Sequence, residues 1–191
     1  MNSELHDRLN LPYSELEELN LRAKEERLNR APVDKVKEER LKYLTDEKRL
    51  KSVSVLFSDL EGRLHMLDYD KTFLVKSWDN LTFDGSSIRG FTAQRESDLR
   101  LGIDWSAFYW APADVFGTGK VLVFGEVIDK NGEPYSADMR GVLKAFAADM
   151  YQKHKYTLNA ANEIEGFLFK GPDAERRFHE LPATVVVDGS R

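Results

Sequence analysis

Two glutamates in i, i+2 spacing, Glu163 and Glu165, offer the most direct metal chemistry in the sequence. They lie in residues 162–169, Asn-Glu-Ile-Glu-Gly-Phe-Leu-Phe, whose apolar end is typical of a β-strand. In an extended strand, residues i and i+2 face the same side, so the two carboxylates would lie side by side. Such like charges are costly unless a cation neutralises them, and Mg²⁺ or Mn²⁺ prefers oxygen ligands. The spacing suits a divalent-metal site, but an isolated Glu-x-Glu pair is more often two solvent-facing glutamates on an edge strand, and the residues alone favour that interpretation.

A second polar cluster occupies residues 83–91, which read Phe-Asp-Gly-Ser-Ser-Ile-Arg-Gly-Phe. The glycines let the backbone turn tightly, and the hydroxyls of Ser86 and Ser87 are donors beside the carboxylate of Asp84. Taken alone, this pattern favours a turn in which the Asp and Ser side chains cap their own backbone. The surrounding glycine- and serine-punctuated stretch, residues 82–104, predicts a long ordered loop.

The composition of the chain limits the kinds of function that these residues can have. The chain has 191 residues, of which 41% are hydrophobic and 32% charged, with a net charge of −5. This acidic balance argues against nucleic-acid binding. The sequence contains no cysteine, which excludes disulfides and thiolate chemistry and fits a reducing compartment. Because there is no signal-peptide pattern and no apolar run of about 18 residues, we expect a cytoplasmic protein that does not use a membrane.

Residues 1–51 form a charged arm that is rich in Glu, Lys, Arg and Leu and has no glycine. Ser14 and Glu17 have the spacing of a helix capping box, and Pro32 is expected to end this first helix and open a second one. An apolar stripe on the second helix consists of Val33, Val36, Leu41 and Leu44. We expect the arm to pack on the next domain or on a neighbouring subunit and to take no part in chemistry.

Strand patterns begin at residue 52. Val53, Val55 and Phe57 alternate with other residues, and after a Glu61-Gly62 turn the residues 64–67 return as a second strand. This pattern predicts a β-hairpin.

The second half of the chain mixes strands with one helix. Residues 121–128 predict a buried strand, Asn131-Gly132 a turn, and residues 139–153 a helix. The predicted inner face of this helix carries Val142, Leu143, Phe146 and Met150. Residues 157–169 predict one or two further strands, so the sequence reads as a small α+β domain.

The string Phe-Asp-Gly-Ser-Ser-Ile at residues 83–88, followed by Gly-Phe and then by Glu-Ser-Asp at residues 96–98, resembles the N-terminal signature of glutamine synthetases. Weaker matches support it: residues 57–62 resemble the first hairpin of that family, and residues 138–140 resemble the start of the helix that leads into its catalytic domain. Residues 162–169 resemble its first metal-binding strand, although Gly166 stands where the family usually carries an aromatic residue.

This resemblance covers roughly residues 50–180 and implies an α+β fold. It places a β-grasp-like domain at residues 52–152, after the helical arm at residues 1–51. Residues 153–191 would then be the stub of an incomplete catalytic domain.

The resemblance also implies roles for single residues. In glutamine synthetases the Asp-Gly-Ser-Ser loop reaches into the active site of the adjacent subunit, which assigns ammonium binding and deprotonation to Asp84, with Ser87 as a second substrate-binding candidate. A carboxylate suits this task because it attracts a cation and can accept its proton. Glu163 and Glu165 would be ligands of the two active-site Mg²⁺ or Mn²⁺ ions. The implied reaction joins ammonium to glutamate through a γ-glutamyl phosphate, with ATP as co-substrate, in a homo-oligomeric ring.

Two alternatives stay open at this point. One is a related ligase that forms γ-glutamyl amides of other amines or polyamines, and the other is a non-catalytic module that binds such oligomers. Two glutamates do not complete two metal sites, so we expect no ligase activity from this chain alone. Residues 181–191 do not resemble the continuation of the family, which suggests a lost reading frame near Glu180 or added foreign residues.

Overall fold

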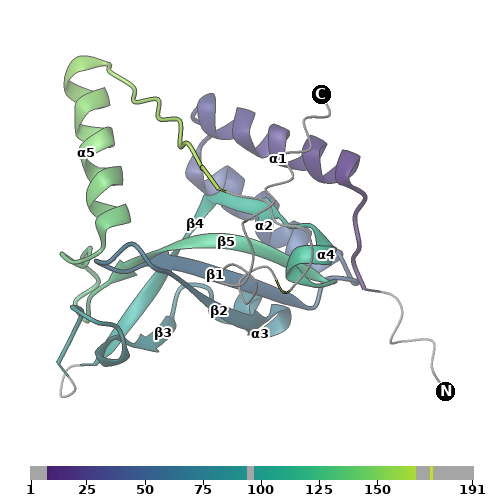
Figure 1. Ribbon diagram of the computed structural model, residues 1–191, viewed down its shortest axis with the longest axis horizontal. Coiled ribbons are helices and arrows are strands. Elements are labelled where there is room, and N and C mark those ends of the chain that lie inside the picture. Colours follow the sequence, from purple (N-terminus) through teal and green to yellow (C-terminus); the bar gives the residue numbers. More distant parts are fainter. Residues whose placement is uncertain (1–7, 94–96, 167–172, 174–191) are drawn as a thin grey trace. The chain divides into compact units, whose positions relative to one another are not determined.

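The computed structural model describes residues 8–93, 97–166 and 173 (Figure 1). The chain divides into two compact units, residues 1–155 and residues 156–191. The helices and strands of the described residues all lie in the first unit. No helix in this described part of the chain is long and apolar enough to cross a membrane.

The N-terminal arm forms two helices, α1 (Tyr13–Leu28) and α2 (Val33–Asp46), as predicted. The predicted capping box is wrong, because the N-cap of α1 is Pro12, two residues before Ser14, and no side chain caps the helix. Pro12 suits the place directly before the helix because the proline ring fixes its φ near −65°. Helix α1 also ends before Pro32: Arg30 adopts a φ of 53°, and the amide of Ala31 donates to the carbonyl of Glu26 at 2.9 Å. Pro32 serves only as the N-cap of α2.

Five strands form one mixed sheet in the order β2-β1-β5-β4-β3. The strands are β1 (Ser52–Ser58), β2 (Leu64–Asp70), β3 (Leu81–Asp84), β4 (Asp98–Trp110) and β5 (Lys120–Ile128). Strands β1 and β5 pair in parallel, and every other neighbouring pair is antiparallel. The predicted hairpin is confirmed, because β1 pairs with β2, and Gly62 in the turn has a φ of 78°. Two short helices, α3 (Lys71–Ser77) and α4 (Ala113–Phe116), follow β2 and β4.

The long loop predicted for residues 82–104 is wrong at both ends. Strand β3 ends at Asp84 and β4 begins at Asp98, so only the residues between them connect two paired strands. Buried residues of β4, such as Leu99, Leu101 and Trp105, alternate with partly exposed polar ones. A strand with one buried face carries polar residues on the other face, and this polarity is what resembled a loop in the sequence.

The arm packs on the sheet, so the predicted contact with the next domain is confirmed. Helices α1 and α2 both contact β4, and Figure 1 shows them lying over that part of the sheet. Their buried side chains are Leu16, Ala23, Val36 and Leu44. The Asn20 side chain donates to the carbonyl of Trp110 at 2.9 Å and accepts from its amide at 3.1 Å. Val33, which the sequence placed in the apolar stripe, is 71% exposed because it lies at the start of α2.

Helix α5 (Met139–His154) has the predicted position, but its predicted inner face is wrong. No residue of α5 is buried, and Val142, Leu143 and Phe146 are between 51% and 60% exposed. Met150 is only half-buried. Figure 1 shows the reason: α5 leaves the sheet at its N-terminal end and does not lie along either face of it.

The described part of the second unit has no regular structure. Residues 156–166 form neither helix nor strand, so the strands predicted from residue 157 are wrong over this range. A strand needs a partner for its backbone groups, and these residues pair with no other described strand. Residues 167–169, where the prediction continued, and the unusual segment 181–191 lie outside the described residues.

Candidate functional site

The turn after β3 brings together two of the predicted site residues, Asp84 and Ser87. Residues Gly85–Ser87 form a single 3-10 turn that begins at Asp84. One oxygen of the Asp84 carboxylate accepts from the amide of Ser86 at 2.9 Å and from its hydroxyl at 2.6 Å. The other oxygen accepts from the Ser87 hydroxyl at 3.2 Å. The side chain therefore caps its own turn, as the residues alone suggested, and Asp84 and Ser87 both stay exposed to solvent.

These hydrogen bonds set the ionisation state of Asp84. The hydroxyl and the amide of Ser86, with smaller help from Ser87, hold the pKa of the Asp84 carboxyl below its ordinary value of 3.8. Hydrogen bonds donated to a carboxylate favour its charged form. Near neutral pH, Asp84 is therefore an exposed anion in a fixed turn.

Gly85 explains how the turn is held on the sheet. Gly85 is buried, and its amide donates to the carbonyl of Ser97 at 2.7 Å. A Cβ at this position would lie 2.6 Å from the Cδ1 of Leu99 and 2.8 Å from the Oγ1 of Thr92. Only glycine lets the backbone come this close to the start of β4.

The turn of the first hairpin supports the same segment from a second direction. Arg89 donates to Glu61 with a separation of 2.8 Å, and Gly90, whose φ is 84°, packs against Leu60. This contact joins residues 57–62 and residues 83–91, two motifs that were noted separately in the sequence. It is a long-range contact, so no local pattern could have predicted it.

An aromatic cluster lies beneath these two turns. The ring centroids of Phe57 and Phe83 are 4.8 Å apart, and that of Phe91 lies 6.4 Å from Phe57 and 5.4 Å from Tyr135. Aromatic pairs at such distances stabilise packing beyond the area they bury. The cluster connects β1, β3 and the segment after the turn, and so it fixes the position from which Asp84 faces solvent.

The structure does not place the two predicted metal ligands in a metal site. Glu163 and Glu165 are exposed in the second unit, where no strand holds them on a common face. Among residues 8–93, 97–166 and 173, no group of three or more Asp, Glu or His residues could hold a metal ion. The two carboxylates have suitable chemistry, but the described residues supply no further ligands.

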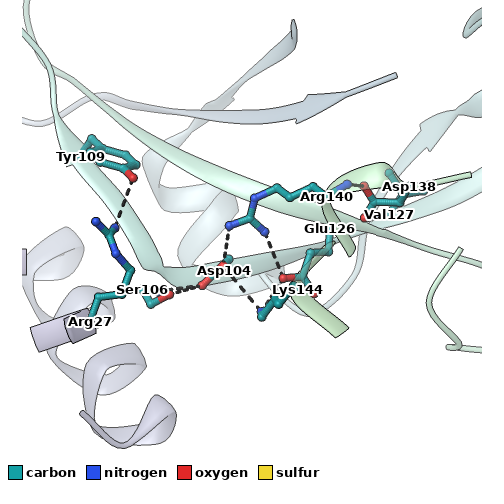
Figure 2. Close-up of polar contacts among 9 residues, drawn as sticks. All are labelled: Arg27, Asp104, Ser106, Tyr109, Glu126, Val127, Asp138, Arg140 and Lys144. Carbon is teal, nitrogen blue, oxygen red and sulfur yellow. Dashed lines mark hydrogen bonds and ion pairs between the residues drawn. The ribbon is translucent and has the colours of Figure 1, made fainter. Parts of the chain in front are cut away.

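Sequence reasoning missed a charged network that anchors α5 (Figure 2). The guanidinium of Arg140 donates to Asp104 on β4 at 2.6 Å and to Glu126 on β5 at 3.0 Å. Lys144, one turn further along α5, also pairs with both carboxylates. Beside it, the buried carboxylate of Asp138 accepts from the amides of Val127 at 2.9 Å and Arg140 at 3.1 Å. The partners are distant in sequence, so only the fold reveals the network.

The network also keeps Asp104 ionised. Burial alone would raise the pKa of this carboxyl, but hydrogen bonds from Ser106 and Arg140 and the charge of Lys144 outweigh burial and lower it. A buried carboxylate with such partners is stable as an anion, whereas the same carboxylate without them would not be. Asp104 therefore serves to hold α5.

A mixed five-stranded sheet with a parallel β1–β5 pair and packed helices defines an α+β domain of the β-grasp class. Residues 49–130 match the family described as the β-grasp domain of glutamine synthetase. Residues 49–130 are thus similar to the β-grasp domain of glutamine synthetases, and the resemblance inferred from the motifs is confirmed.

Individual relatives agree with this assignment. A glutamine synthetase from Methanosarcina mazei is 36% identical over 129 residues, which are 65% of this chain and 28% of the relative. One from Thermotoga maritima is 30% identical over 131 residues, 68% of this chain and 30% of the relative. The chain therefore spans less than a third of the length of these relatives.

Solved structures show the same fold. A glutamine synthetase from Plasmodium falciparum superimposes with a TM-score of 0.54 at 20% identity, over 60% of this chain and 22% of that one. A structure of GmaS without ligand gives a TM-score of 0.52 at 18% identity. The predicted α+β, β-grasp-like fold is confirmed.

Replacing Gly85 by alanine tests how tightly the turn is packed. The new Cβ would force the buried Leu99 or Thr92 to move, so we expect the free energy of unfolding to fall by about 1–3 kcal/mol. Urea denaturation measures this change. As a control, Gly166→Ala, where a Cβ meets nothing within 4 Å, should change stability by less than about 0.5 kcal/mol. Unchanged stability of Gly85→Ala would contradict the close packing of the turn on β4.

The Asp104 network predicts a specific dependence of stability on pH. The folded pKa of Asp104 is lower than its ordinary value of 3.8, so its contribution is present above that pH and is lost as the pH falls through the folded pKa. Asp104→Asn should be less stable than the parent at pH 7, and the difference should shrink below about pH 4. Denaturation curves from pH 2.5 to 7 measure it. Ser106→Ala, which removes one donor to Asp104, should have a stability between those of the parent and Asp104→Asn at pH 7. A stability difference between the parent and Asp104→Asn that stays the same at every pH would contradict the network.

Proposed function

We propose that this chain is the N-terminal part of a glutamine synthetase, which joins ammonia to the side-chain carboxylate of glutamate with ATP, through a γ-glutamyl phosphate. One observation carries the proposal: the domain that matches the family holds the Asp-Gly-Ser-Ser turn in place with an exposed, ionised Asp84. In this proposal the complete enzyme is a cytoplasmic homo-oligomeric ring with active sites between subunits. The Asp84 turn of one subunit then completes the site of its neighbour.

Asp84 would bind ammonium through its negative charge, and the Ser87 hydroxyl beside it would help to position the cation. One N–H proton of ammonium passes to the carboxylate, which leaves ammonia with a free lone pair. That lone pair forms the new C–N bond at the activated carbonyl carbon of glutamate, and the C–O bond to phosphate breaks. The departing phosphate takes up the proton that the nitrogen loses as the amide forms. The hydrogen bonds that lower the pKa of Asp84 make it a weaker base. We therefore expect attraction of the cation to be its larger contribution.

Glu163 and Glu165 would supply carboxylate ligands for Mg²⁺ or Mn²⁺. Their oxygen donors suit such hard cations, but two carboxylates do not complete one octahedral site, still less two. When bound, the metal would neutralise charge on the transferred phosphoryl group. The remaining ligands and the ATP site would have to come from beyond the described residues, so the chain alone is expected to be inactive.

The exposed apolar face of α5 supports the same proposal. Met139, Val142, Leu143 and Phe146 are each at least 44% exposed. A row of large apolar side chains on one helix is typical of a contact surface. The relatives have about 70% of their length outside the matched region, and we propose that part of this length covers α5.

The proposal is tested first with the purified 191-residue chain and then with a chimera. The chain alone should form no γ-glutamyl hydroxamate from ATP, glutamate and hydroxylamine. In the chimera, residues 49–130 replace the matching segment of the Methanosarcina mazei relative. It should form glutamine, and Asp84→Asn should lower kcat/KM for ammonium at least about 100-fold, because it removes both the charge that attracts the cation and the group that accepts its proton.

Two comparisons make the result decisive. Asp79→Asn, which removes an exposed carboxylate outside the turn, should leave kcat/KM for ammonium within about twofold of the parent chimera. Putrescine in place of ammonium should not be used, and its use would favour the related polyamine ligase. A folded, oligomeric chimera without ammonium-dependent activity, or one indifferent to Asp84→Asn, would contradict the proposal.

A further inference from the structure

A cavity with a basic rim lies between the two N-terminal helices and β4, on elements other than the Asp84 turn. Its volume is about 350 Å³, enough for a small organic molecule. Three arginines line it, Arg27 and Arg30 from the end of α1 and Arg40 from α2. The other lining residues are Ala23, Glu26, Ala31, Pro32, Val33, Val36 and Ser106.

Arg40 is the unusual member of this group. It is only 8% exposed, and one side of its guanidinium pairs with Glu26. The buried Nε of Arg40 has no hydrogen-bond partner among the described residues. Buried charged groups normally have all their donors satisfied, because an unmet N–H loses its hydration without compensation. This Nε has no surface open to the cavity, and the guanidinium carbon lies 5.3 Å from the ring centroid of Trp110 and 5.8 Å from that of Phe108. The two rings therefore flank the unpaired N–H, and Arg40 lines the cavity with its other atoms.

The charges of the residues that line the cavity favour an anionic ligand. Three guanidinium groups face one carboxylate, that of Glu26, which Arg22 also approaches at 3.5 Å from outside the cavity. The exposed arginines make contacts that leave donors free. Arg27 gives one N–H to the Tyr109 hydroxyl at 3.3 Å, as Figure 2 shows, and Arg30 lies over the ring of Tyr151 with 3.4 Å between its Cζ and the ring centroid. A guanidinium stacked on a ring keeps its N–H groups in its own plane, available for an oxyanion.

We propose that this cavity binds a small organic anion whose carboxylate or phosphate group contacts Arg40, Arg27 and Arg30. The apolar wall formed by Ala23, Pro32 and Val36 suits a short carbon chain on the same molecule. Arginine is well suited to such recognition because its planar donors match the oxygens of a carboxylate or phosphate. The site is separate from the proposed ammonium site in sequence and in the elements that build it, so it is a site for a second ligand.

Isothermal titration calorimetry of the 191-residue chain at low ionic strength tests this proposal. Glutarate serves as the carboxylate probe and inorganic phosphate as the phosphate probe, so that the two sources of the anion are distinguished. At least one should bind saturably with a 1:1 stoichiometry, and binding should weaken as NaCl is added. Arg30→Gln and Arg27→Gln should each weaken binding about tenfold, as expected for losing one charge-assisted hydrogen bond.

Lys24→Gln is the matched control, because it removes the same charge from an exposed position on α1 that does not line the cavity. It should leave the affinity within about twofold of the parent. Arg40→Lys keeps the charge but removes the planar guanidinium from the cavity wall, and should also weaken binding. If this variant does not fold, the results for Arg27→Gln and Arg30→Gln test the proposal without it. Absence of saturable binding by both probes would overturn the proposal. Equal effects of Lys24→Gln and Arg30→Gln would overturn it as well.

Discussion

The close approach of Gly85 to Leu99 is the constraint on which the candidate site depends. Because no side chain separates the turn from β4, the backbone after Asp84 lies directly on the sheet. The short turn then directs Ser86 and Ser87 back toward the Asp84 carboxylate. The Asp84 carboxylate is consequently held as an anion at the surface and is not buried. The chemistry proposed for Asp84 therefore depends on the close packing of its neighbour Gly85 against Leu99.

Other elements of the fold contact this turn and hold it in place. The first hairpin contacts the turn through Glu61 and Leu60, and the aromatic cluster fills the space beneath both. Strands β4 and β5 carry the carboxylates of Asp104 and Glu126, which bind Arg140 at the start of α5. Polar anchoring at one end, with an apolar face left exposed, suits a helix that makes its main contacts with other parts of a larger protein.

The sequence predicted local features well and long-range ones poorly. The hairpin and the position of α5 follow from alternation, turn residues and helical periodicity, all of which act over short distances. Strands β3 and β4 were missed because the polar residues on one face of a strand look like those of a loop. The inner face of α5 was misjudged since periodicity shows which face is apolar, but not whether the described chain covers it. The motif singled out Asp84 and Ser87 as candidate site residues, whereas the Arg140 network depends on pairing between distant strands.

Titration of the Asp84 carboxyl by NMR in the 191-residue chain tests the central claim most directly. The account predicts a pKa below the ordinary value of 3.8, because Ser86 and Ser87 donate hydrogen bonds to the ionised form. In Ser86→Ala, which removes the hydroxyl donor, the pKa should rise toward 3.8 while the fold is kept. A pKa of Asp84 at or above 3.8 in the parent chain, or one that does not respond to Ser86→Ala, would contradict the account.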